Sequence, residues 1–435
     1  MNQIERKRVL NNIVSPYGLA LFSYAVFLFA CLIPPSIYTH YMHEPDLMFL
    51  DPATILFYTL CVGAFVAGVW FFEKLFPLGP FVERKLEVRI SPTTFLLIPL
   101  AVAVAITALS SVLLVKNNPL LVVMLLAQQA GGLRGTDGGG LEFGGTLRSA
   151  ALFLIGIIWW TLWHYYQSGL QGWGRRAVKL GLFLAVLTVF ISATLTVSRQ
   201  PFVAVVSGMA ILYLLRKVFI GQLSWSLVGR IGCVVVFGGA FFFFMVSWLR
   251  GGTDENSQVD ALVGYTIASY NRMAALLAGR LHYQYSGKGI YFSNFVLFND
   301  TFNRFIPFGK LMNVPDYFDW WTSEFSAVGR AGLNASMILC GMFGEIYIEI
   351  GWFAPIYVFA YGLLYGFTWR RMREGRLIGI LLYPYFAGLI LGWFGTNAVF
   401  EAITAALVAD AIILSAYEFL FVHQSKSLTR APQIG

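Results

Sequence analysis

Residues 237–249 read FGGAFFFFMVSWL, a stretch that is apolar on every face. A helix at a protein surface in water would show a polar side, and a barrel strand would alternate in polarity. This stretch does neither, and within a bilayer only helices and closed barrels satisfy the backbone hydrogen-bonding groups. We therefore expect it to belong to a transmembrane helix.

The rest of the chain repeats this pattern. Apolar runs of about 20 residues, each able to cross about 30 Å of hydrocarbon as a helix, recur along the sequence. They occupy residues 17–35, 53–73, 94–115, 147–166, 178–198, 201–215, 231–249, 352–369, 377–394 and 397–420. The runs predict an all-α, polytopic membrane helix bundle of about ten transmembrane helices. The first run lacks a small-residue cleavage pattern, so we expect a retained helix rather than a signal peptide.

The composition agrees with a lipid environment. Of the 435 residues, 58% are hydrophobic and only 12% are charged, too few to cover the surface of a globule in water. The four cysteines show no CxxC spacing, so the sequence predicts buried thiols rather than a zinc site or a disulfide framework.

The distribution of Lys and Arg predicts the orientation. If the N-terminus is cytoplasmic, 19 of the 30 Lys and Arg residues fall in cytoplasmic ends and loops. This excess follows the positive-inside rule and places both termini in the cytoplasm. The net charge of +8 is therefore mainly a signal of topology and gives no reason to expect nucleic acid as a partner.

The chain divides into three parts. Residues 1–249 should form transmembrane helices 1–7 with short loops, and residues 336–435 should form helices 8–10 and a cytoplasmic C-terminus. Between them, residues 250–335 should form one large extracytoplasmic loop. Residues 259–281 of this loop have helical periodicity but too many polar residues to cross a membrane, so we expect a helix at the membrane surface.

Arginine residues on the predicted outer side are the first candidate site residues. Arg199 stands in the turn TLTVSRQPF between two apolar runs, where either an anion meets it or it reaches the headgroups. The other candidates are Arg134, Arg250, Arg272, Arg280 and Arg330. Guanidinium groups around one mouth of the bundle could clamp a diphosphate. Alternatively, the loop arginines pair with the loop acids Asp254, Glu255, Asp260, Asp300, Asp316, Asp319 and Glu324.

Carboxylate and aromatic residues complete the candidate set. Glu345 and Glu349 lie one helical turn apart in an apolar stretch, and either of them or His282 could accept a proton from a hydroxyl group. Tyr270 and Trp320 could contact substrate, Trp320 by stacking on a sugar ring. An aromatic belt at the membrane interface explains such residues equally well.

The sequence resembles the Wzy-type polymerases of oligosaccharide repeat units. The similar features are the turn Ser198–Arg199–Gln200, the single large outer loop late in the chain, and the pattern of Gly341, Gly344, Glu345, Tyr347 and Gly351 after that loop. The likeness covers the layout of the whole chain together with these few residues.

The resemblance implies a glycosyl transfer between two undecaprenyl-diphosphate-linked oligosaccharides at the outer face of the bacterial cytoplasmic membrane. This reaction is expected to require no cofactor and no metal. Together with the residue patterns above, the resemblance gives Arg199, Arg250, Arg280, His282 and Glu345 as the candidate catalytic residues. Substrate binding then falls to Arg134, Arg272, Arg330, Tyr270 and Trp320. Membrane lipid and a chain-length regulator protein are the further expected partners.

Two other functions remain open. A ligase that moves finished glycan to another lipid would use a similar clamp and a different acceptor pocket. A transporter predicts internal repeats, broken helices and a polar pathway at mid-membrane. The two halves of this sequence show no repeat, and the large loop on one side favours a site at one surface.

Overall fold

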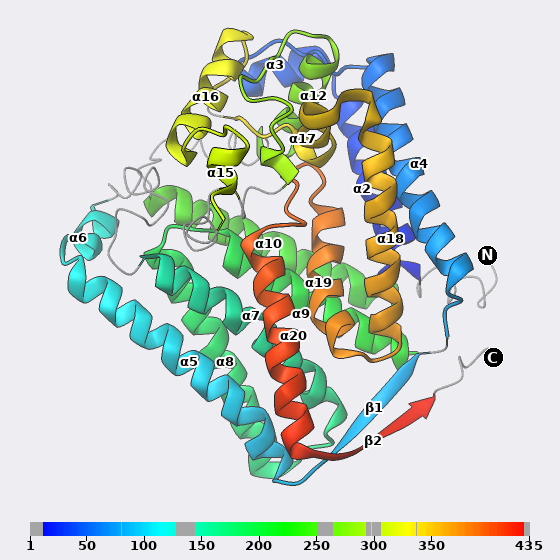
Figure 1. The fold of residues 1–435 in the computed structure, drawn as a ribbon, viewed down its shortest axis with the longest axis vertical. Coiled ribbons are helices and arrows are strands. Elements are labelled where there is room, and N and C mark those ends of the chain that lie inside the picture. The colour runs from blue at the N-terminus through cyan, green and yellow to red at the C-terminus, as the bar shows by residue number, and fades with distance from the viewer. Residues whose placement is uncertain are drawn as a thin grey trace.

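The structure is a computed structural model that describes residues 12–79, 81–127, 144–249, 264–292, 297, 306–335 and 337–429. Within these residues the chain forms a bundle of helices and one two-stranded sheet (Figure 1). The long helices are α2 (Pro16–Cys31), α4 (Pro52–Leu75), α5 (Pro92–Asn117), α7 (Gly144–Gln167), α8 (Gly172–Leu195), α9 (Gln200–Phe219), α10 (Trp225–Leu249), α18 (Ala354–Arg373), α19 (Leu377–Leu391) and α20 (Ala402–Phe421). The predicted class, an all-α polytopic membrane bundle, is confirmed.

Shorter elements connect these helices. They are α3 (Pro35–Met42), β1 (Val82–Val88), α6 (Leu120–Leu126), the π-helix η2 (Gly264–Ala268), α12 (Ser269–Leu277), α15 (Phe308–Leu311), α16 (Tyr317–Arg330), α17 (Gly341–Ile350), the 3₁₀ turn η3 (Gly351–Phe353) and β2 (Val422–Thr429). Of the predicted outer loop 250–335, the structure thus describes η2, α12, α15 and α16. That this loop lies on the extracytoplasmic side of the membrane remains a prediction.

Each of the ten predicted apolar runs coincides with a long helix, although not every helix is a full span. Eight helices in the described ranges are long and apolar enough to cross a membrane, or nine if the bent pair α2–α3 is one span. The helix axis bends by 93° between α2 and α3. Pro34 and Pro35 explain this break, since proline lacks the N–H group that would continue the helix. Helix α19, with 15 residues, is shorter than the run predicted for it.

The two strands are a feature that the helical prediction did not include. Strand β1 follows α4 and pairs antiparallel with β2, which follows α20, so that Val82 lies opposite Thr429 and Val88 opposite Val422. Their backbones therefore meet at one end of the bundle, which we call the strand end. The opposite end carries α3, α12, α16 and α17, and we call it the loop end (Figure 1).

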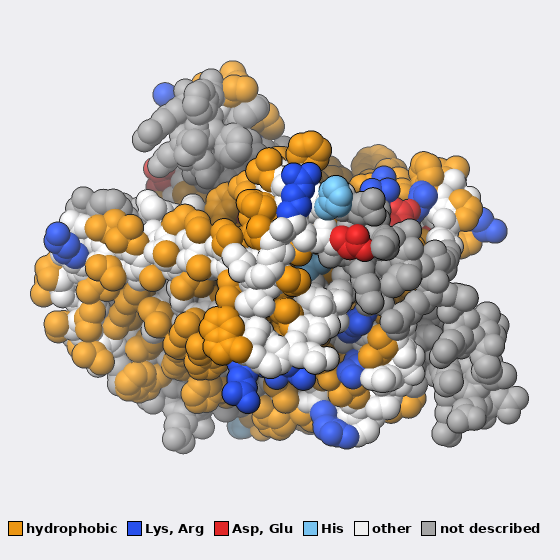
Figure 2. Space-filling view, turned by 90° about the horizontal axis from the view of Figure 1, so that it is seen from below, with side chains coloured by type: hydrophobic (Ala, Val, Ile, Leu, Met, Phe, Trp, Pro, Cys, Tyr) orange, Lys and Arg blue, Asp and Glu red, His pale blue; other side chains and the backbone are white. Residues whose placement is uncertain are grey.

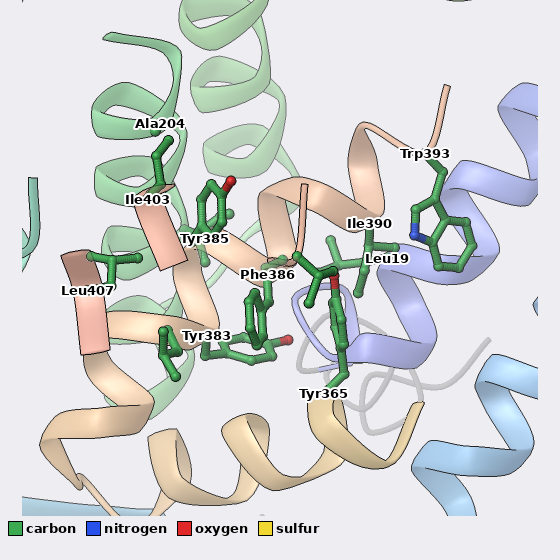
Figure 3. Packing of buried hydrophobic residues seen from close by; sticks show 14 of the residues in the cluster. Leu19, Ala204, Tyr365, Tyr383, Tyr385, Phe386, Ile390, Trp393, Ile403 and Leu407 are labelled. Atoms are coloured by element: carbon green, nitrogen blue, oxygen red, sulfur yellow. The ribbon is translucent and has the colours of Figure 1, made fainter. Parts of the chain in front are cut away.

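Helix α19 lies in the centre of the bundle. Its residues Tyr383, Phe386 and Ile390 are buried among side chains from α2, α9, α18 and α20 (Figure 3). The ring of Phe386 stacks on that of Tyr365 from α18, with 4.9 Å between the ring centres. This helix is covered by protein on all sides, which explains why it can be short and uniformly apolar.

Helices α4 and α18 approach each other closely at two glycine residues. A Cβ atom on Gly68 would lie 2.2 Å from the carbonyl oxygen of Phe359, and one on Gly362 would lie 2.3 Å from that of Phe65. Small residues allow this kind of contact between membrane helices. The pair thus forms one wall of the bundle.

The outer surface of the bundle suits lipid. On α10, the side chains of Val234, Phe237 and Phe241 are 70%, 72% and 68% exposed. Cys233 is exposed on the same helix, so the prediction of buried thiols holds for Cys31, Cys61 and Cys340 but is wrong for Cys233. Apolar side chains in such positions require an apolar solvent.

Basic residues collect at the strand end. Helix α9 ends with Arg216 and Lys217, and α18 ends with Arg370, Arg371 and Arg373. Figure 2, which views the molecule from this end, shows Lys and Arg side chains spread among apolar ones. By the positive-inside rule this end is the cytoplasmic candidate.

Candidate functional site at the loop end

Arg199 lies where α9 begins, in contact with α10. Its Nη2 atom donates a hydrogen bond of 2.6 Å to the Ser247 hydroxyl, and its guanidinium carbon lies 3.6 Å from the centre of the Phe243 ring. The side chain is half-buried. The first N–H groups of a helix and the helix dipole both favour an anion at the helix N-terminus. Arg199 therefore adds a positive charge at a point where the backbone already attracts negative charge.

Gln200 connects this turn to the start of α20. Its side-chain amide donates a short hydrogen bond to Glu401, the N-cap residue of α20. Burial raises the pKa of the Glu401 carboxyl, whereas the bond from Gln200 and the nearby positive charge of Arg148 lower it. Arg148 is exposed near the start of α7. The turn Ser198–Arg199–Gln200 thus lies beside a carboxylate and a second arginine.

Asn397 joins Glu345 to the segment before α16. Its backbone N–H donates a 2.5 Å bond to Glu345, and its side-chain amide donates a 3.0 Å bond to the carbonyl oxygen of Tyr291. The Tyr361 hydroxyl donates to the remaining amide oxygen of Asn397 over 2.8 Å. Glu345 itself is only 6% exposed. It is therefore held rigidly, close to the connection between α19 and α20.

Tyr291 also contacts two further carboxylates. Its backbone N–H donates a 2.9 Å bond to Glu349, which accepts a second bond of 2.7 Å from Gly289. The Tyr291 hydroxyl donates a short hydrogen bond to Glu324 on α16. We call Glu324, Glu345, Glu349 and Glu401 the carboxylate cluster, since the charges of the other three act on Glu345.

Glu324 is the titratable member of this cluster that lies on the long loop. Burial raises the pKa of its carboxyl to about 8, and the charge of Glu349 adds to the effect, while Tyr291 and Trp320 oppose it through hydrogen bonds. A carboxyl group with such a pKa exchanges its proton near neutral pH. The cluster can therefore hold or release a proton at the loop end.

Arg272 is fully buried and paired with Glu44, which precedes α4. The two side chains are 0% exposed, and Nη2 of Arg272 lies 2.8 Å from Oε2 of Glu44. The other donors of Arg272 reach the second oxygen of Glu44 and the carbonyl oxygens of Ala268, Asn334 and Met337. A guanidinium has five N–H donors, and all five have acceptors here. None is left for a diphosphate, so we omit Arg272 from the candidate substrate contacts.

Two aromatic candidates are also buried. Tyr270 is 1% exposed, and its ring packs against Phe27 of α2 and Tyr58 of α4. Trp320 is 6% exposed and packs against Tyr317 and Tyr291. Tyr270 points into the bundle, so we omit it too. Trp320 forms part of the small core of α16 rather than an open face for a sugar ring.

Three other candidates are exposed at the loop end. Arg280 and His282 follow the end of α12, and Arg330 is in the last turn of α16. These side chains are available to a large substrate. Arg134 and Arg250 lie outside the described residues. The structure thus places Arg199 and Glu345 beside connections between transmembrane helices, and Arg280, His282 and Arg330 on the surface above.

The sequence indicates the candidate residues better than it indicates the residues that contact them. Glu44 is not among the candidates that the sequence offers, although a glutamate between two apolar runs is a recognisable signal. Asn397 and Arg148 carried no signal of their own. The predicted alternative, in which loop arginines pair with loop acids, does not describe Arg272, whose partner Glu44 comes from another part of the chain. Asp316 instead caps α16 by accepting the backbone N–H of Asp319.

The fold and this polar end define a multi-pass membrane protein with arginine and carboxylate side chains gathered at one end of its bundle. Among the described residues, no group of three or more His, Cys, Asp or Glu side chains is arranged to hold a metal ion. Comparisons of the chain with protein-family models, curated proteins and solved structures found no match.

Proposed function

We propose that this chain is a polysaccharide polymerase of the Wzy type, which joins undecaprenyl-diphosphate-linked oligosaccharide repeat units at the outer face of the bacterial cytoplasmic membrane. The proposal rests mainly on the position and contacts of Arg199. A half-buried guanidinium lies at the start of α9, and the next residue, Gln200, is bonded to Glu401 of the carboxylate cluster. A guanidinium that can stabilise an anionic leaving group and carboxylates that can take up a proton thus occur at the same end of the membrane bundle.

The reaction makes two demands on the protein. An acceptor hydroxyl of the incoming unit attacks C1 of the sugar that links the growing chain to its lipid diphosphate. The bond from this C1 to the diphosphate oxygen breaks. Arg199 stabilises the negative charge that develops on the departing undecaprenyl diphosphate. The hydroxyl proton passes to Glu345 or His282. Arg280 and Arg330 are further donors on the surface, and Arg134 and Arg250 remain candidates from the sequence.

The proposal includes an orientation. The loop end faces the extracytoplasmic side, and both termini and the basic strand end face the cytoplasm. A chain-length regulator protein and membrane lipid are the proposed partners. In a Cys233→Ser background, an impermeant maleimide should label Gln284→Cys in intact spheroplasts and should label Gln222→Cys, at an exposed position beyond α9, only after lysis. The reverse pattern would refute this orientation.

The decisive genetic test is a deletion of the gene in its host, followed by complementation. Wild type should restore a ladder of surface glycans, whereas deletion should leave a single repeat unit. Arg199→Ala should behave like the deletion although the protein still inserts, because the leaving group loses its counter-charge. Loss of a preorganised donor of this kind costs about 10²–10³ in rate. The measurement is the glycan ladder on a gel.

Arg230→Ala is the matched control. Arg230 is an exposed arginine near the start of α10, and among the described residues its side chain bonds only to Ser226 in the same helix. It should restore the full ladder. If Arg199→Ala also restored the full ladder, the clamp would be ruled out.

One observation favours a transporter as the second candidate. Asp410 on α20 is 1% exposed, and Oδ2 of its carboxyl has no hydrogen-bond partner among the described residues. A Cβ atom on Gly156 of α7 would lie 2.1 Å from that oxygen. Ionisable residues inside membrane spans are often functional. A transporter would move the lipid-linked unit across the bilayer without lengthening it, which the same gel and a flipping assay distinguish.

A further inference from the structure

The buried ion pair of Glu44 and Arg272 ties three distant parts of the chain together. Glu44 lies between α3 and α4, Arg272 is in α12, and Asn334 lies between α16 and α17. The guanidinium meets the carboxylate through two parallel hydrogen bonds of 2.8 Å. Bidentate pairs of this kind fix orientation as well as distance.

The carboxylate of Glu44 is as fully engaged as the guanidinium. It accepts a hydrogen bond of 3.0 Å from the side-chain amide of Asn271, one of 2.7 Å from the backbone N–H of Asn334, and a short one from the Tyr38 hydroxyl. Burial raises the pKa of Glu44, but Arg272 and the hydrogen bonds from Tyr38 and Asn334 outweigh burial and lower it. The Glu44 carboxylate is therefore held in its ionised form, and both side chains are closed to solvent.

Asn271 reinforces the connection. Its side-chain oxygen accepts the backbone N–H of Leu47 over 2.7 Å, and its amide also donates to the Pro45 carbonyl over 2.9 Å. Neighbouring residues of α12 thus both bind the segment before α4. A helix of nine residues gains most of its stability from such tertiary contacts, because isolated helices of this length are marginal in water.

The position of α12 determines where the exposed candidates lie. The backbone N–H groups of Arg280 and Leu281 donate to the carbonyl oxygen of Ala275 in α12, over 2.9 and 3.1 Å. His282 follows directly. On the other side, Ala275 and Leu276 pack in one buried cluster with Cys340. Movement of α12 would therefore displace Arg280 and His282 and would uncover the Cys340 thiol.

We propose that Glu44 and Arg272 form a clasp that docks α12 on the loop end, and that Arg272 acts as a positioning residue for Arg280 and His282 rather than as a contact for substrate. The clasp itself follows from the contacts above. That Arg280 and His282 meet a substrate rests on the proposed function.

The reactivity of Cys340 tests the clasp without reference to any product. The assay uses the full chain in lipid nanodiscs with Cys233→Ser, which removes the exposed thiol. Arg272→Met or Glu44→Leu leaves one buried charge without its partner, whereas the double variant removes both charges. Each single variant should accelerate maleimide labelling of Cys340 at least about tenfold, and the double variant should return most of the way to wild type.

Two controls keep the result interpretable. Arg280→Met removes an exposed arginine outside the clasp and should leave Cys340 labelling at the wild-type rate. Arg272→Lys keeps the charge, supplies three donors in place of five and should give an intermediate rate. If a single variant fails to insert, Arg272→Lys and the double variant decide the question. Wild-type labelling in Arg272→Lys, or a double variant as reactive as the worse single variant, would overturn the clasp.

The glycan ladder then separates positioning from binding. If Arg272 only positions, the double variant should regain polymer that the single variants lose. A double variant with protected Cys340 and no polymer, in a host where wild type does polymerise, would return Arg272 to substrate binding and contradict the inference. If wild type itself makes no polymer, the proposed function fails, while the labelling result on the clasp still stands.

Discussion

Individual charged residues at the loop end distinguish this protein from a purely apolar helix bundle. Arg199, Arg272 and Glu345 are each expensive to bury, and the structure gives each at least one specific partner: Ser247, Glu44 and Asn397. The type of residue could be recognised from the sequence, because a charge among apolar residues stands out. The partner could not, since Glu44 and Arg272 are 228 positions apart.

Glu324 makes docking of α16 depend on pH. Burial raises the pKa of its carboxyl from an ordinary 4.5 to about 8. A raised pKa means that the docked state binds the proton more tightly than the open one, so its stability is full below about pH 4.5 and falls as pH rises through about 8. Above that pH, an ionised Glu324 would face Glu349 and the Tyr291 hydroxyl without a counter-charge in the described contacts.

We therefore expect limited proteolysis within residues 306–335 to accelerate between about pH 6 and about pH 9. Glu324→Gln imitates the protonated form and should flatten the pH profile, and it also controls for the pH dependence of the protease. An equal acceleration in wild type and Glu324→Gln would show that another group is responsible.

At the scale of elements, hydropathy predicted the helices well because lipid leaves the backbone few choices. The ten runs coincide with ten helices. Helix α5 extends two residues beyond its run at each end, α10 begins six residues before its run, and α8 begins six residues before its run and ends three residues short of it. The bend after α2 depends on two consecutive prolines, and the β1–β2 pair joins segments from opposite ends of the sequence. No local pattern marks such a pairing, so the strands were not predicted.

The close contact of α4 with α18 gives a prediction at this scale. Gly362→Leu would place atoms against the backbone of α4 at Phe65, where side chains cannot give way. Overpacking of this kind costs about 1–3 kcal/mol or more. The melting temperature in detergent should fall. Gly63→Leu, on α4 at a position with no neighbouring atom within 4 Å of an added Cβ, should change it little. Equal melting temperatures for both variants would contradict the packing described.

The whole molecule has two unlike ends, a basic strand end and a loop end with arginines and carboxylates. Composition and the distribution of Lys and Arg predicted this polarity. The sequence did not reveal which candidates share one site. Arg199 is linked through Gln200 to Glu401, whereas Arg272 and Tyr270 serve the interior. Such assignments depend on contacts between segments that are distant in sequence.

The most direct test of the central claim uses purified protein in liposomes with a synthetic undecaprenyl-diphosphate oligosaccharide on the face of the loop end. We expect products of two and more repeat units, with one undecaprenyl diphosphate released for each bond formed, and neither product with Arg199→Ala. Unchanged oligosaccharide that instead appears on the opposite face of the bilayer would contradict a polymerase and establish the transporter.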